Sequence, residues 1–137
     1  MFHWIETTLD RIMDGPVAVS VRMMGEDEMS GLNASYRGRS GATNVLSFPA
    51  DEADESGVRL LGDIAICTDV VAREAEEQKK PLSSHVAHMV VHGLLHLAGH
   101  DHEEENEAVE MERLETELLA MLGFSDPYEV AAEGELK

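Results

Sequence analysis

The sequence contains a single cysteine, few aromatic residues and no long hydrophobic run. With Cys67 alone the chain has no internal disulfide, which suits a reducing compartment, so we expect a cytoplasmic protein. No apolar run approaches the ~18 residues that a membrane-spanning helix needs. The N-terminus also lacks the basic start and small-residue cleavage site of a signal peptide. These absences argue against a membrane protein and against a secreted, disulfide-bonded scaffold.

The 137 residues suit one domain, which we expect to span residues 1–128 and to be followed by an acidic, frayed tail over 129–137. We expect an α+β fold with a small mixed sheet of about three or four strands and about four or five helices, and hydrophobic periodicity predicts the individual elements. The predicted strands are 17–23, 45–48 (ended by Pro49) and 60–67; the predicted helices are 3–14, 27–37, 69–80, 84–97 and 103–122. We expect 60–67 to be a central strand because it is largely apolar.

Six of the seven histidines lie between residues 85 and 102. In a helix over 84–97 each residue advances about 100° around the axis, so His88, His92 and His96 lie along one stripe. The apolar residues of the segment point to the opposite side. We therefore predict a central helix that packs one face on the core and presents its histidines to a cleft.

The spacing of these histidines predicts a metal site. His92 and His96, at positions i and i+4, can reach one ion from one helix face. Gly99 accepts the left-handed conformation that ends a helix, and the turn after it can bring His102 over the same face. The pattern H-x-x-x-H-x-x-G-x-x-H has the spacing of the long zincin signature. Three imidazoles leave a coordination position for water, so we predict one catalytic zinc ion per chain.

The residue after the first predicted ligand departs from that signature. In zincin proteases it is the glutamate that accepts a proton from water, whereas here it is Gly93. The sequence therefore predicts the metal site without the usual peptidase mechanism. Asp101, His100 or an oxygen of the substrate could act as the base. Asp101 could equally orient a ligand histidine through its second ring nitrogen, which is the role that we favour.

The string H-G-L-L-H-L-A-G-H-D-H over 92–102 resembles the signature of the YbeY family, bacterial metal-dependent endoribonucleases of ribosomal RNA maturation. Two further stretches agree with the family: L-N-A-S-Y-R-G-R-S-G-A-T-N-V-L-S-F-P over 32–49 and L-G-D-I-A-I-C over 61–67. The resemblance covers residues 17–128, and the family usually has tyrosine at the position of His100.

This resemblance implies a zincin-like fold, zinc bound by His92, His96 and His102, and a functional arginine at Arg37. It also implies cleavage of single-stranded RNA in ribosomal RNA maturation and ribosome quality control. The implied partners are ribosomal particles or ribosome-associated proteins, and we expect neither DNA nor a membrane as a partner.

Two arginines and one histidine are the candidate substrate contacts. Arg37 can form two hydrogen bonds to a phosphate, although its position alone also fits a solvated residue near a helix C-terminus. Arg39 is a second candidate phosphate contact. His88 is a candidate substrate contact, but His85 and His88 also fit hydrogen-bonded histidines of a cleft wall.

The net charge of −18 opposes RNA binding, because phosphate backbones attract Lys and Arg. However, seven of the ten basic residues lie between Arg22 and Lys80. We therefore expect a local basic entrance with weak or partner-assisted binding; an acid-rich source proteome is the alternative reading of the charge. Two other functions stay open: a ribosome-assembly factor with a structural zinc, and a zinc hydrolase of another substrate.

Overall fold

The computed structural model describes residues 2–53, 55–100 and 104–128. Within these residues it contains a three-stranded mixed sheet and five helices, which confirms the predicted α+β class. The strands are β1 (Val17–Met24), β2 (Val45–Ala53) and β3 (Arg59–Cys67); the helices are α1 (Phe2–Ile12), α2 (Glu26–Arg37), α3 (Thr68–Glu77), α4 (Leu82–Leu97) and α5 (Glu105–Met121).

The sheet has the order β1-β3-β2, with β1 parallel and β2 antiparallel to the central strand β3. Side chains of β3 alternate between two hydrophobic clusters. Ile64 and Ile66 pack with helix α4, while Ala65 and Cys67 pack with helix α2 on the opposite face. Strand β3 is therefore buried on both faces, as its apolar sequence predicts.

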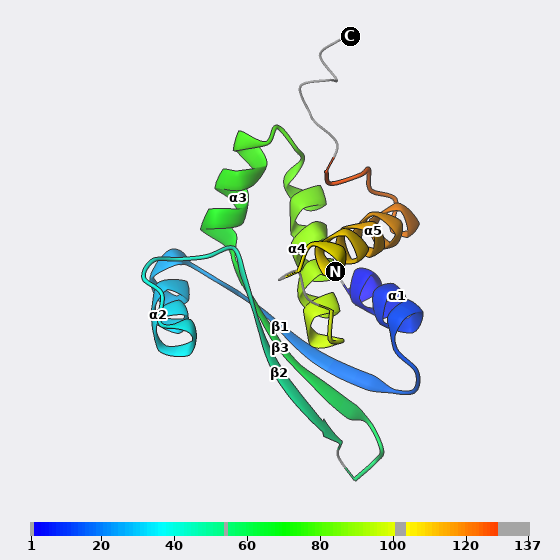
Figure 1. Cartoon of the computed structure of the whole chain (residues 1–137). Helices are drawn as coiled ribbons and strands as arrows, with labels where there is room; N and C mark the ends of the chain where they lie inside the picture. Colours follow the sequence, from blue (N-terminus) through cyan, green and yellow to red (C-terminus); the bar gives the residue numbers. More distant parts are fainter. Residues whose placement is uncertain (1, 54, 101–103, 129–137) are drawn as a thin grey trace.

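Helix α4 lies at the centre of the molecule, with α2 across the sheet from it (Figure 1). Val90 and Leu94 face the sheet, and both are completely buried. Val91 and Leu95 face helix α5 in a separate cluster. Because two sides of α4 are covered by protein, the histidines on its remaining side define where a site can form.

Strand β2 continues through Pro49 instead of ending there, so that predicted boundary is wrong. Proline has no N–H to donate and is tolerated in a strand at the edge of a sheet. Strand β2 is such an edge, and its register with β3 shifts between Pro49 and Glu52. Gly62, opposite Pro49, has a φ of 146°, and an added Cβ would collide with the carbonyl oxygen of Phe48.

Two further features differ from what the local sequence suggests. A serine at position 83 or 84 could cap helix α4, but its N-cap residue is Pro81, with no side-chain hydrogen bond at the cap. Asp63, within the apolar run of β3, could be a buried carboxylate, but it is exposed and belongs to neither hydrophobic cluster. None of the helices in the described ranges is both long and apolar enough to cross a membrane.

Candidate metal centre and cleft

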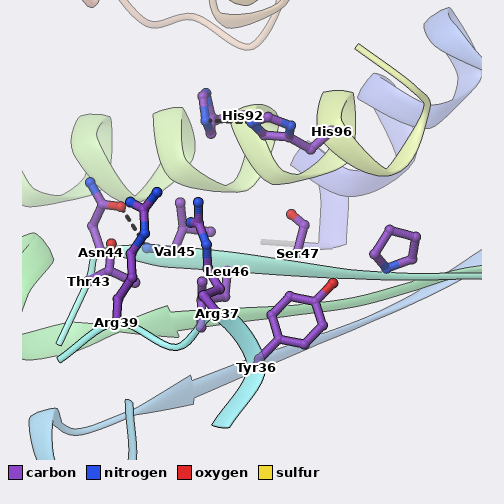
Figure 2. Close-up of a pocket in the computed structure, with 11 residues that line it drawn as sticks. Tyr36, Arg37, Arg39, Thr43, Asn44, Val45, Leu46, Ser47, His92 and His96 are labelled. Carbon is purple, nitrogen blue, oxygen red and sulfur yellow. Dashed lines mark hydrogen bonds between the residues drawn. The ribbon is translucent and has the colours of Figure 1, made fainter. Parts of the chain in front are cut away.

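A cleft of about 740 Å³ separates helix α4 from the loop between α2 and β2 (Figure 2). His92 and His96 line it from α4, and Arg37 and Arg39 line it from the facing side. The other residues that line it are Tyr36, Thr43, Asn44, Val45, Leu46, Ser47 and Pro49. The two histidines and two arginines singled out by the sequence, from segments more than 50 residues apart, therefore share one cleft.

Arg37 is the last residue of helix α2, and local structure fixes the turn that follows it. Gly38 adopts a left-handed φ of 68°, and its N–H bonds to the carbonyl oxygen of Ala34. The buried Asn33 donates from Nδ2 to the carbonyl oxygen of Gly41 at 2.8 Å, which holds the loop against the helix. Figure 2 shows the side chains of Arg37 and Arg39 extending from this loop toward α4.

These two arginines give the cleft a positive wall. Among the described residues neither Arg37 nor Arg39 forms an ion pair, whereas Arg22, Arg73 and Arg113 each pair with glutamates. No acidic residue is among the described residues that line the cleft. In a chain with a net charge of −18, this cleft can therefore accept an anion.

Asn44 forms part of the cleft wall and is fixed from two directions. Its Nδ2 donates to the carboxylate oxygens of Glu74 at 3.1 and 3.3 Å, and its Oδ1 accepts the N–H of Val45 at 2.7 Å. Glu74, on helix α3, also accepts a hydrogen bond of 2.8 Å from Nε2 of the buried His85. His85 is therefore a hydrogen-bonded histidine that supports this wall from behind.

The Nε2 atoms of His92 and His96 lie 3.1 Å apart. Zinc–nitrogen bonds of about 2.0–2.1 Å in a tetrahedral arrangement place two ligand nitrogens about 3.3 Å apart. The observed separation therefore fits two ligands of one zinc ion. A third imidazole would complete the predicted set, but His102 lies outside the described residues, as does Asp101. The described residues alone contain no group of three His, Cys, Asp or Glu side chains that could hold a metal ion.

Glu115 of helix α5 fixes the orientation of His92. Its Oε2 accepts a hydrogen bond of 2.5 Å from Nδ1 of His92, which leaves Nε2 of that ring available to a metal. Glu115 is completely buried. Burial alone would raise its pKa, but hydrogen bonds from His88, His92 and Tyr128 outweigh burial and lower the pKa to about 2. The carboxylate is therefore charged when it holds the imidazole.

His88 and Tyr128 complete the hydrogen bonding of Glu115. His88 Nε2 lies 3.3 Å from Oε1 of Glu115, and the Tyr128 hydroxyl donates to the same oxygen. Desolvation and the neighbouring carboxylate raise the pKa of Tyr128, so its hydroxyl stays a donor. His88 does not line the cleft, and this placement favours the hydrogen-bonded role over the substrate contact that the sequence also suggested.

Glu115 is not among the site residues predicted from the sequence, because most glutamates of an amphipathic helix such as α5 face solvent. Met111, Glu115 and Leu118 are nevertheless spaced i, i+4 and i+7, and all three are buried. The spacing places Glu115 on the apolar face of the helix, and a single glutamate on such a face indicates a buried, hydrogen-bonded carboxylate.

The structure also gives a physical reason for Gly93. A Cβ at this position would lie 3.0 Å from two side-chain atoms of Ile64 on β3, so glycine allows α4 to pack closely on the sheet. The Ser47 hydroxyl donates to the carbonyl oxygen of Gly93 at 3.1 Å, across the same contact. Position 93 therefore faces the core, where even an added Cβ would require the side chain of Ile64 to move.

Comparisons with known proteins identify a family and a fold that this chain matches. Residues 2–123 match the family model described as endoribonuclease YbeY. The chain is 52% identical over 130 residues to an endoribonuclease YbeY of Cellvibrio japonicus, covering 95% of this chain and 73% of the relative. It also resembles the solution structure of TM1509 from Thermotoga maritima, with a TM-score of 0.58 and 29% identity over 93% of this chain and 88% of the other.

Proposed function

The chain belongs to the endoribonuclease YbeY family, and from this premise we propose that it is a zinc-dependent endoribonuclease specific for single strands. We further propose that it acts in the cytoplasm on ribosomal RNA, in maturation and quality control, in contact with ribosomal particles or ribosome-associated proteins. The family membership supports the endoribonuclease activity. The zinc dependence, the specificity for single strands and the ribosomal context are further parts of the proposal that the family membership alone does not establish.

One observation carries this proposal: two arginines and two potential metal ligands face each other across the same cleft. Hydrolysis of a phosphodiester needs cationic groups on the phosphoryl oxygens and a way to activate the attacking oxygen. Arg37 and Arg39 supply the first requirement. His92 and His96, with their Nε2 atoms 3.1 Å apart, suit the second.

Each residue then has a distinct task. His92, His96 and His102 would hold the zinc ion, which when bound supplies Lewis-acid polarisation of a phosphoryl oxygen and of a water molecule. Arg37 would bind the phosphate with its planar guanidinium group and neutralise the charge that develops there. Arg39 would contact the same or the adjacent phosphate.

The proton acceptor is one of the candidates named from the sequence: Asp101, His100 or an oxygen of the substrate. Position 93 is glycine, and no acidic side chain is among the described residues of the cleft. Asp101 lies outside the described residues and directly precedes the predicted ligand His102. We propose that Asp101 either accepts the proton or orients a ligand histidine.

The observations favour this function over the two alternatives. A peptidase of the zincin type uses a glutamate at position 93, where this chain has glycine. A purely structural zinc would substitute for a missing core, but three hydrophobic clusters already surround α4 and the sheet.

Cleavage of a labelled, unstructured RNA and of its duplex tests the proposal, with zinc content measured on the same preparations. We expect Arg37→Ala to lower kcat/KM for the single strand by about 10²–10³-fold, the loss typical of a group that stabilises developing charge, with zinc content unchanged. His96→Ala should lose both zinc and cleavage.

Arg73→Ala is the matched control, because Arg73 is an exposed arginine that pairs with Glu26 outside the cleft. It should keep wild-type activity. Equal cleavage by the wild type and His96→Ala would indicate a contaminating nuclease and contradict the proposal, as would full activity in Arg37→Ala.

A further inference from the structure

Tyr36 is an exposed aromatic residue at the end of an apolar stripe on helix α2. Met29, Leu32 and Tyr36 recur at i, i+3 and i+7 along α2, the spacing of an apolar stripe. Met29 is completely buried, whereas Tyr36 is 51% exposed and lines the cleft beside Arg37. The first residue of the stripe is therefore in the core, whereas the last, Tyr36, places its aromatic ring on the wall of the cleft.

The ring of Tyr36 is held in place from below. It packs against Phe48 of β2, with ring centroids 4.3 Å apart and planes inclined by 56°. This contact leaves about half of the residue exposed. Figure 2 places the ring on the same side of the cleft as Arg37 and opposite helix α4. A supported, half-exposed ring beside a cation is the arrangement by which proteins stack single-stranded bases and hold the adjacent phosphate.

We propose that Tyr36 determines the preference for single strands by stacking on one unpaired base of the RNA while Arg37 holds the neighbouring phosphate. This inference rests on the proposed endoribonuclease function. In a duplex both faces of each base are covered by its neighbours, so the ring can be engaged only by a base that has left the stack. Tyr36 is thus a binding and specificity residue, and the reacting atoms lie at the histidines.

The test is binding of zinc-loaded protein to a short unstructured RNA by fluorescence anisotropy at low salt. A series of RNAs carries a single abasic nucleotide at each position in turn. The proteins are the wild type, Tyr36→Leu, Tyr36→Trp and, as a control, Leu82→Ala. Leucine keeps an apolar contact with Phe48 but cannot stack as a ring, whereas tryptophan can. Leu82 is 52% exposed and lies outside the cleft.

Stacking of one base on an aromatic side chain changes affinity by about five- to a hundredfold. We expect wild-type affinity to fall by that factor at one abasic position. Tyr36→Leu should bind intact RNA with the same loss, should no longer respond to that abasic position, and should prefer single strands over duplex less strongly. Tyr36→Trp should retain the wild-type profile, and Leu82→Ala should match the wild type throughout.

Cleavage of the same RNAs separates this inference from the function on which it rests. We expect Tyr36→Leu to raise KM more than it lowers kcat. An abasic profile that is flat in the wild type, or unchanged in Tyr36→Leu, would overturn the stacking role while leaving cleavage intact. A wild type that shows the sensitive position without cutting RNA would support stacking and overturn the nuclease function alone. A wild type that neither binds nor cuts would overturn both.

Discussion

Replacement of Glu115 by glutamine tests whether a buried carboxylate tunes the metal site. The substitution keeps the size and one carbonyl-type acceptor, but it removes the negative charge that Nδ1 of His92 contacts at 2.5 Å. Coordination of zinc withdraws electron density from the imidazole and makes Nδ1–H a stronger donor. The carboxylate therefore stabilises the zinc-bound state more than the metal-free state.

The magnitude follows from the hydrogen bond itself. A hydrogen bond to a charged group contributes about 1.5–3 kcal/mol, and a neutral one contributes about half as much. Glu115→Gln should therefore weaken zinc binding by up to about 1.5 kcal/mol, or up to about tenfold. This value lies at the lower end of the ~10–100-fold range that is typical of residues behind metal ligands.

Competition of each protein against a zinc chelator of known affinity measures this difference. Glu112→Gln is the matched control, since Glu112 lies on the same helix and is exposed. It should bind zinc as the wild type does. The unfolding transition of the metal-free proteins separates the two roles open to Glu115. A lower unfolding midpoint with unchanged zinc affinity would refute the reasoning and leave Glu115 a purely structural residue.

Four further outcomes follow from the structure. Gly62→Ala should lower the free energy of unfolding in urea by about 1–3 kcal/mol, because it forces a side chain into a left-handed conformation against Phe48; unchanged stability would contradict this packing. Removal of zinc should leave a folded protein with a cooperative transition by circular dichroism, since three hydrophobic clusters already pack the helices and the sheet together; an unfolded metal-free protein would favour a structural zinc. Asn44→Ala should raise KM for RNA with zinc affinity unchanged, because Asn44 ties the cleft wall to Glu74; an unaltered KM would show that the wall needs no such tie. Affinity for single-stranded RNA should fall with a slope of about −1.4 in log K against log salt concentration, as expected for two cations on two phosphates, and a much steeper slope would require contacts beyond the cleft.

The sequence predicted those features of the fold that depend on local periodicity. The stripe of His88, His92 and His96 correctly placed a helix with one polar face, and Gly38 and Gly99 marked real turns, with φ of 68° and 101°. Boundaries that depend on strand pairing were not predictable. A proline such as Pro49 interrupts a strand only if that strand is paired on both edges. Whether a strand lies at the edge of the sheet depends on the order of the strands, which the sequence of one strand does not reveal.

The candidate site divides in the same way. Spacing along one helix placed the Nε2 atoms of His92 and His96 together, as predicted. The prediction that Arg37 belongs to the site depended on the family resemblance. A residue at the end of a helix has no periodic neighbours that would indicate which part of the molecule it faces. Glu115 was missed because its partner His92 is 23 residues away, on a helix whose packing against α5 is a property of the tertiary structure. The role of His102 stays a prediction.

The excess of negative charge acquires a function if the proposed activity is correct. Arg22, Arg73 and Arg113, which lie outside the cleft, are paired with glutamates and offer a phosphate less attraction. Arg37 and Arg39 have no such partner among the described residues, and they line a cleft without a described acidic side chain. Long-range repulsion then lowers the affinity of RNA for the exterior, while the short-range field of the two arginines acts only on a strand that enters the cleft. On the proposed function, the acidic composition would direct RNA to the cleft that Tyr36, Arg37 and Arg39 line, and this would reconcile a net charge of −18 with action on a polyanion.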